Sequence, residues 1–281
     1  MATNSLDAVL AQYEKAKGGS NGANKMSQED RMKKYFAAIL TQNETSGQKR
    51  LRILPTPDGS SPFKEVWYHE VQVEGKWNKI YDPGKNDNER SPLTEIHDEL
   101  MSTGKESDKE LAKSYKPRKF YIVKVIDRDN EADGVKFWRF KHNYKNEGIL
   151  DKIIPIWKAK GDITDPVNGR DLIIELAKAK TPKGATYTVI QTVMHDDPSP
   201  VHTDAETAKT WTEDPLTWAD VYSKKPVEYL EAIARGETPR WSSDLGKYVY
   251  GDAASEMSVG GGNMSIVDPQ AGDEPDGDLP F

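Results

Sequence analysis

Two segments of this sequence interleave basic and aromatic residues in a way that could hold nucleic acid. One runs from Lys116 to Tyr121, and the other runs from Lys136 to Lys145. Binding of a single strand uses both residue types, because cations track the phosphates and aromatic faces stack on any base, at ~1–3 kcal/mol per base. The same residues could also form two ordinary hydrophobic strands with solvated lysines, so both interpretations stay open.

The second segment is typical of a strand, in which successive side chains alternate between two faces. One face would carry Lys136, Trp138 and Phe140, and the other would carry Val135, Phe137, Arg139 and Lys141. We expect one aromatic set to face the core, so that only some of these rings can reach a ligand. The candidate ligand contacts from this segment are Lys136, Trp138 and Arg139.

The C-terminal end of the sequence holds the excess negative charge of the chain. The net charge is −7, and the stretch from Gly251 to Phe281 contains seven acidic residues and no Lys or Arg. The rest of the chain has 39 acidic residues against 39 basic ones. A neutral body can hold a basic groove, so the total charge does not argue against a nucleic-acid partner.

The last residues of this acidic stretch could be a docking signal for another protein. A short apolar terminus can enter a pocket while its carboxylate and the preceding acids meet basic residues of the partner. The same acids could occupy a basic groove of the body and weaken nucleic-acid binding until they are displaced. A tail that only solubilises the chain is the alternative. The candidate partner contacts are Asp276, Asp278, Leu279, Pro280 and Phe281.

Spacings that would indicate an enzyme or a metal site are missing. The chain has no cysteine, which excludes disulfides, thiolate zinc sites and cysteine nucleophiles. The acidic run that starts at Asp127 has Ala132 and Trp138 where a calcium-binding EF-hand needs Gly and Glu. The five histidines show no HExxH spacing, and the glycines at 18–22 do not form a phosphate-binding loop. We expect no catalytic activity, no cofactor and no metal, with a metal-dependent nuclease as the alternative from another class.

Strands and turns must position the candidate residues. Alternating and β-branched runs predict strands over 50–54, 66–73, 76–81, 119–126, 135–140, 171–176 and 187–193. Helices are predicted over 93–115, over 148–158 with a bend or end near Pro155, and over 215–235. This order predicts a mainly β protein with α insertions. The OB-fold, a five-stranded Greek-key barrel, is the commonest such barrel among nucleic-acid binders.

Composition divides the chain into three parts. Residues 1–25 combine a short amphipathic stretch with a Gly/Ser/Asn run, which predicts a flexible N-terminal arm; a frayed terminus is the alternative. Residues 26–250 are the predicted core. Residues 251–281 have the composition of a disordered tail. No apolar run approaches the ~20 residues of a membrane span, and the N-terminus does not resemble a signal peptide, so we expect a cytoplasmic protein.

The order of several short motifs resembles the replicative single-stranded DNA-binding, or helix-destabilising, proteins of T-even-like phages. The likeness covers residues 48–195, and its specificity comes from the order and spacing of the motifs rather than from any one of them. The motifs are Arg52-Ile53-Leu54-Pro55, Pro62-Phe63, His69, Gly75-Lys76-Trp77, Phe120 to Ile126, Asn130 to Phe140, Asp151-Lys152-Ile153 and Pro166 to Gly169.

This resemblance implies an OB-fold core, an N-terminal arm for cooperative self-association and an acidic tail that contacts replication proteins. By position, it assigns base stacking to Phe120, Tyr121 and Tyr187. It assigns phosphate contacts to Lys116, Arg118 and Lys119.

The sequence departs from the family pattern in three places. The best-known members hold a zinc with one His and three Cys, but Ser91-Pro92-Leu93-Thr94 stands here in place of the Cys pair. We therefore expect no zinc, and segment 82–115 must be shortened or held by packing. The terminus is more similar to the tail of bacterial single-stranded DNA-binding proteins, whose last Phe is the partner anchor. The arm shows no basic cooperativity motif, so self-association is only a possible role for it.

Together these features predict a non-catalytic protein that binds and protects single-stranded DNA, without sequence preference, in phage DNA replication, recombination and repair. Its expected partners are single-stranded DNA and phage or host replication proteins. Its expected location is the cytoplasm of an infected bacterial host. A single-strand annealing protein is the alternative within the same class, and an adaptor that acts only through its tail is a third.

Overall fold

The computed structural model describes residues 33–73, 76–143, 147–181, 184–217, 224–242, 245 and 247–250. The strands are β1 (Ser46–Ile53), β2 (Lys64–Val73), β3 (Lys76–Tyr81), β4 (Arg118–Asp127), β5 (Val135–Lys141), β6 (Arg170–Lys180), β7 (Thr186–Pro198), β8 (Arg240–Ser242) and β9 (Lys247–Val249). The helices are α3 (Pro83–Asp87), α4 (Pro92–Ser102), α5 (Glu106–Ala112), α6 (Ile149–Lys160), α7 (Ala205–Thr212) and α9 (Val227–Ala234), with short 3₁₀ turns η1 (Lys113–Tyr115) and η2 (Glu131–Asp133).

The predicted arm (1–25) and tail (251–281) lie outside the described residues. Within the described part of the chain, no helix is long and apolar enough to cross a membrane.

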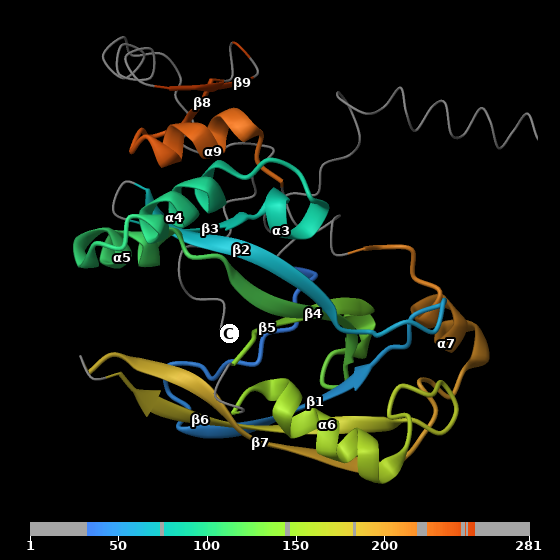
Figure 1. The fold of residues 1–281 in the computed structure, drawn as a ribbon. Helices are drawn as coiled ribbons and strands as arrows, with labels where there is room; N and C mark the ends of the chain where they lie inside the picture. Colours follow the sequence, from blue (N-terminus) through green and yellow to red (C-terminus); the bar gives the residue numbers. More distant parts are fainter. Residues whose placement is uncertain are drawn as a thin grey trace, which may run out of the picture.

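Seven antiparallel strands form one bent sheet, in which β4 is the central element. The order is β3-β2-β4-β1-β6-β7, and β5 pairs with β4 off this path. β5 pairs with β4 from Phe120 to Ile126, so β2 and β1 share the other edge of β4, β2 near its start and β1 near its end. Figure 1 shows the consequence: β1, β6, β7 and α6 form the lower part of the molecule, and β2 and β3 rise with α4 and α9 in the upper part. The predicted mainly β architecture with helical insertions is confirmed, and the OB-fold itself stays a prediction.

Both faces of β4 and β5 are covered by apolar side chains. Tyr121, Trp138 and Phe140 lie in the larger core together with residues of β1, β6 and α6. Phe120 and Phe137 lie in a second core with residues of β2 and β3. The predicted alternation along β5 is therefore confirmed. One aromatic set faces a core as expected, and the other faces a second core because the bent sheet has packed side chains on both sides.

Segment 82–115 folds into α3, α4, α5 and η1 and packs beside β2. Its apolar contacts join Leu93 to Val71, Ile80 and the buried face of α9. The single helix predicted over 93–115 is wrong in one respect. Gly104 adopts φ 71°, a left-handed conformation that ends a helix, so the segment divides into α4 and α5.

A buried polar cluster fastens this segment to β2. His69 and Asp82 are both 0 % exposed. Nδ1 of His69 donates to the carbonyl of Tyr115 at 2.7 Å, since a carbonyl only accepts. Nε2 of His69 lies 3.3 Å from the Asp82 carboxylate, which also accepts the Thr94 hydroxyl at 3.0 Å. Because these groups satisfy one another and no thiolate is present, the donor set does not fit a structural zinc.

The remaining helices differ from the predicted ones in their bounds. α6 continues past Pro155 to Lys160, because Ile153, Ile156 and Trp157 anchor both sides of the proline in the larger core. Within the described residues of the helix predicted over 215–235, 215–217 and 224–226 are not helical and α9 is present, and α7 was not predicted. α7 is short and polar, and it begins at an Asp204 cap whose carboxylate accepts from the Thr207 amide at 2.8 Å.

Candidate nucleic-acid interface

An opening lined by aromatic side chains lies between the β1–β2 loop, β4 and α6. We call it the aromatic hollow; its volume is about 560 Å³. Its lining residues are Pro55, Thr56, Gly59, Ser60, Ser61, Pro62, Phe63, Glu65, Tyr121, Leu150, Ile154, Trp157, Asp162 and Thr164. The lining therefore combines apolar and aromatic side chains with hydroxyl groups and two carboxylates.

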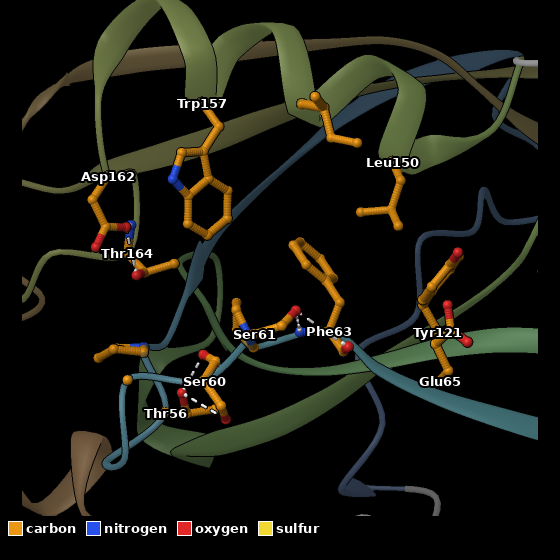
Figure 2. A pocket seen from close by; sticks show the side chains of 14 residues that line it. Thr56, Ser60, Ser61, Phe63, Glu65, Tyr121, Leu150, Trp157, Asp162 and Thr164 are labelled. Atoms are coloured by element: carbon orange, nitrogen blue, oxygen red, sulfur yellow. Dashed lines mark hydrogen bonds between the residues drawn. The ribbon is translucent and has the colours of Figure 1, made fainter. Parts of the chain in front are cut away.

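Aromatic rings from three distant parts of the chain converge in this hollow. The centroid of Phe63 lies 6.1 Å from that of Trp157 and 6.2 Å from that of Phe140, and Tyr121 lies 5.8 Å from Phe140. Figure 2 shows the Phe63 ring pointing toward α6, between Trp157 and Leu150. Phe63 and Trp157 are partly exposed, so their free faces can offer stacking surface to a base.

Local hydrogen bonds hold the β1–β2 loop that carries Phe63. Asp58 accepts from the amide and the hydroxyl of Ser60 at 3.0 and 2.7 Å. These contacts hold the pKa of Asp58 below its ordinary value. Ser61 accepts from the Phe63 amide at 3.3 Å. Such turns preset the loop, and the ring of Phe63 needs little ordering to meet a ligand.

A lysine, Lys119, lies beside the aromatic hollow, next to two rings. The Lys119 ammonium lies 5.5 Å from the centroid of Trp67 and 5.4 Å from that of Tyr121. It also donates to Glu65 at 2.9 Å. Burial opposes the charge of Lys119, but Glu65 outweighs it and raises the pKa of Lys119. The lysine is therefore held as a cation beside two π-faces, an arrangement that suits a phosphate next to a stacked base.

A second opening of about 260 Å³ lies on the other side of the start of α6. We call it the side hollow; its lining residues are Ala38, Trp138, Phe140, Lys141, Asn143, Glu147, Gly148, Ile149, Lys152, Tyr187, Thr188, Val189 and Ile190. Tyr187 is 48 % exposed. Lys152 donates to the carbonyl of Ile190 at 3.2 Å, which ties α6 to the β6–β7 hairpin. A ligand that passes the start of α6 would meet aromatic residues in both hollows.

A comparison with known protein families identifies the family of the chain that carries this surface. The family model described as "gp32 DNA binding protein like" matches residues 45–226, which include every lining residue of the aromatic hollow. The chain belongs to the gp32-like DNA-binding protein family. A comparison with curated proteins gives no match. Membership of the gp32-like family supports binding of single-stranded DNA.

Four of the residues predicted to contact DNA in this gp32-like chain are at or near its surface, and a fifth, Tyr121, lines the aromatic hollow although it is only 9 % exposed. Lys119 and Tyr121 meet at the aromatic hollow, and Tyr187 lines the side hollow. Lys116 and Arg118 are exposed just before them on the chain. The structure therefore places Tyr121 and Tyr187 on the two sides of the start of α6.

The other four residues predicted to contact DNA lie in the interior. We therefore reassign them from DNA contacts to packing residues. Phe120 and Trp138 are 1 % and 2 % exposed because β4 and β5 are covered on both faces, although Trp138 borders the side hollow. Lys136 forms ion pairs with Asp127 and Asp133 at 3.2 and 2.7 Å. The Arg139 guanidinium lies over the rings of Tyr35 and Phe120 at 5.0 and 5.5 Å. The predicted tail contacts, at 276 and 278–281, lie outside the described residues.

Two aromatic residues of the hollow, Phe63 and Trp157, were not predicted as contacts. Phe63 was noted only as part of a family motif. For Trp157, however, the sequence of α6 contained a pattern that could have indicated the site. Its sequence has one apolar set at Ile149, Ile153 and Ile156 and another at Leu150, Ile154 and Trp157. A helix with one buried face needs only one such set, so the second set indicated a surface for a ligand.

Proposed function

We propose that this gp32-like protein binds single-stranded DNA across the two hollows and protects it during phage DNA replication, recombination and repair. The observation that carries the proposal is the convergence of Phe63, Tyr121 and Trp157 beside Lys119, within the part of the chain that matches the family. Rings of this kind stack on any base, so binding would show little sequence preference.

The position of the aromatic hollow supports an OB-type arrangement of the strands. The hollow is bounded by the loop between β1 and β2, and OB-folds use the corresponding loop to bind oligonucleotides. We propose that the sheet is an elaborated OB barrel. We further propose that the protein has no catalytic activity and that it acts in the cytoplasm of an infected bacterial host.

A titration of the full chain with fluorescent oligonucleotides tests the proposal. We expect tighter binding to single-stranded DNA than to duplex DNA, and affinity that falls steeply with salt because phosphate contacts release counterions. Equal affinity for duplex, or no affinity for the single strand, would overturn the proposal. Magnesium-dependent degradation of the labelled DNA would instead indicate a nuclease, and faster pairing of complementary strands would indicate an annealing protein.

Aromatic variants test the role of the hollow. Phe63→Ala and Trp157→Ala should each weaken binding by about 5- to 100-fold, since each removes one stacking face. Trp77→Ala is the matched control, because Trp77 is 52 % exposed and lies in neither hollow. Equal affinities for Phe63→Ala, Trp157→Ala and the control would show that DNA does not use the hollow.

We also propose that the acidic tail recruits replication proteins. The support is its sequence, since an acidic stretch that ends in Leu279-Pro280-Phe281 combines an apolar anchor with negative charge. Deletion of residues 273–281 should abolish capture of a phage or host replication protein and leave DNA binding equal or tighter. Undiminished capture by the shortened chain would refute the tail's role.

A further inference from the structure

Two carboxylates of β2 pair with cations of β4 and β5, two of which lie at or beside the hollows. Glu65 accepts from Lys119 at 2.9 Å. Glu70 lies 2.8 Å from the Arg118 guanidinium and 3.8 Å from the Lys141 ammonium. Three cations at one end of β4 and β5 are therefore paired with two anions of the same chain.

Strand register determines where these carboxylates lie. In the β2–β4 pair, Glu65 is opposite Tyr121 and Trp67 is opposite Lys119. Glu65 and Lys119 are thus diagonal neighbours on the face of the aromatic hollow. Glu70 lies five residues after Glu65 on the same strand, and this odd separation places it on the opposite face of the sheet. Glu65 lines the aromatic hollow itself, and Lys141 lines the side hollow, so each hollow has a cation that already has an anionic partner.

The two pairings differ in strength. The Glu65 side chain is 50 % exposed, so solvent screens its attraction for Lys119 and a competing anion can replace it at little cost. The Glu70 side chain is 18 % exposed and faces two cations. Burial, together with the charge of Arg118, lowers the pKa of Lys141 although Glu70 opposes the shift.

We propose that Glu65 and Glu70 are phosphate placeholders: in the free protein they hold Lys119, Arg118 and Lys141 in position, and DNA phosphates compete with them for these cations. Carboxylate and phosphate oxygens are equivalent acceptors for an ammonium or a guanidinium, which is the physical basis of the exchange. The proposal rests on the proposed DNA-binding function. It adds that these two acidic residues keep the affinity for single-stranded DNA below the value that the three cations would give without them.

Neutral variants of the full chain, titrated with a fluorescent oligo-dT, test this inference. Glu65→Gln should tighten binding by about two- to fivefold, the range expected for an exposed ion pair. Glu70→Gln should tighten it by about tenfold, because a less exposed, charge-assisted contact is removed. In each variant the slope of log affinity against log salt should become steeper by up to about 0.7, since one more phosphate contact forms without internal competition.

A matched control separates the placeholder effect from a general change in net charge. Glu237→Gln removes the same charge from a pair with Arg235 at 2.7 Å, and both residues lie outside the two hollows. It should leave affinity and salt slope unchanged. If Glu237→Gln tightens binding as much as Glu65→Gln does, the effect is long-range electrostatics and the placeholder role is wrong.

The remaining outcomes distinguish this inference from the proposed function. Absence of single-stranded DNA binding by the parent protein would overturn both. Binding by the parent that weakens in Lys119→Ala but does not tighten in Glu65→Gln would overturn the placeholders alone. Thermal unfolding of each variant is measured in parallel. If Glu70→Gln does not fold, the affinity of Glu65→Gln alone tests the placeholder proposal, because Glu65 is half-exposed and its substitution leaves the core contacts in place.

Discussion

The two ends of the central sheet are held together by different kinds of interaction. In the core cluster that joins β1, β6 and α6 the side chains are apolar, with Leu51, Ile53 and Ile174 all 0 % exposed; a buried ion pair between Arg52 and Asp171, at 3.0 Å, links the same two strands outside this cluster. Between β2 and α4 the most deeply buried groups include a histidine and an aspartate. Apolar burial is non-directional and insensitive to pH, whereas a buried polar pair depends on geometry and on charge. The apolar cluster should therefore be destabilised most by loss of side-chain volume, and the second region by loss of a single charge.

The largest effect is expected in the apolar region. Trp138→Ala should lower the free energy of unfolding by about 3–5 kcal/mol, because it leaves a cavity beside Phe36 and Phe140. Urea unfolding followed by circular dichroism measures this change. Trp77→Ala, the same substitution at a 52 % exposed site, should change stability by no more than about 0.5 kcal/mol. Similar losses in the two variants would show that volume is not what stabilises this core.

The next largest effect is expected in the polar region. Asp82→Asn should cost about 3 kcal/mol, since it keeps the shape of the side chain but removes the charge that faces His69. Hydrogen exchange should show loss of protection in α4 and α5 while β1 and β6 stay protected. The control is Asp58→Asn, which changes an exposed turn carboxylate with similar hydrogen bonds. Uniform loss of protection across the sheet would contradict the separation of the two regions.

Acid should also destabilise the polar region, but by less than the Asp82→Asn substitution does. Burial opposes the charge of Asp82, but the contacts with His69 and Thr94 outweigh it and lower its pKa from 3.8 to about 2. A lowered folded-state pKa stabilises the protein above about pH 4, and this contribution of about 2 kcal/mol is lost as pH falls through 2. The difference in urea midpoint between the parent protein and Asp82→Asn should shrink over that range. A difference that does not change with pH would contradict the assignment.

The smallest effect on stability is expected at the exposed edge of the apolar region. Tyr187→Ala removes a ring that is 48 % exposed on β7, so stability should change by no more than about 0.5 kcal/mol. Affinity for single-stranded DNA should nevertheless fall about fivefold or more. Met194→Ala, on the same strand but outside both hollows, should leave both quantities unchanged. An unchanged affinity for Tyr187→Ala would remove the side hollow from the DNA path.

Local pattern was sufficient to predict most of the sheet but less of the site. The strands of β1 to β7 follow from alternating and β-branched runs, and Lys119 and Tyr121 follow from the basic and aromatic interleaving. Phe63 and Trp157 are far apart in the sequence, and only the long-range packing of the β1–β2 loop against α6 brings them together. Trp138 and Arg139 were misassigned for the related reason that the sequence does not show how many faces of a strand are covered.

The placement of β1 also has a consequence for how the chain folds during synthesis. β1 forms no hairpin with its neighbour in sequence; its ladders are with β4 and with β6, where Ser46 lies opposite Ala177. Its second partner therefore emerges from the ribosome long after β1 itself, and non-local pairings of this kind form slowly. We expect the edge of β1 that faces β6 to remain unpaired in the newly made chain, and open to chaperones, until β6 has been translated.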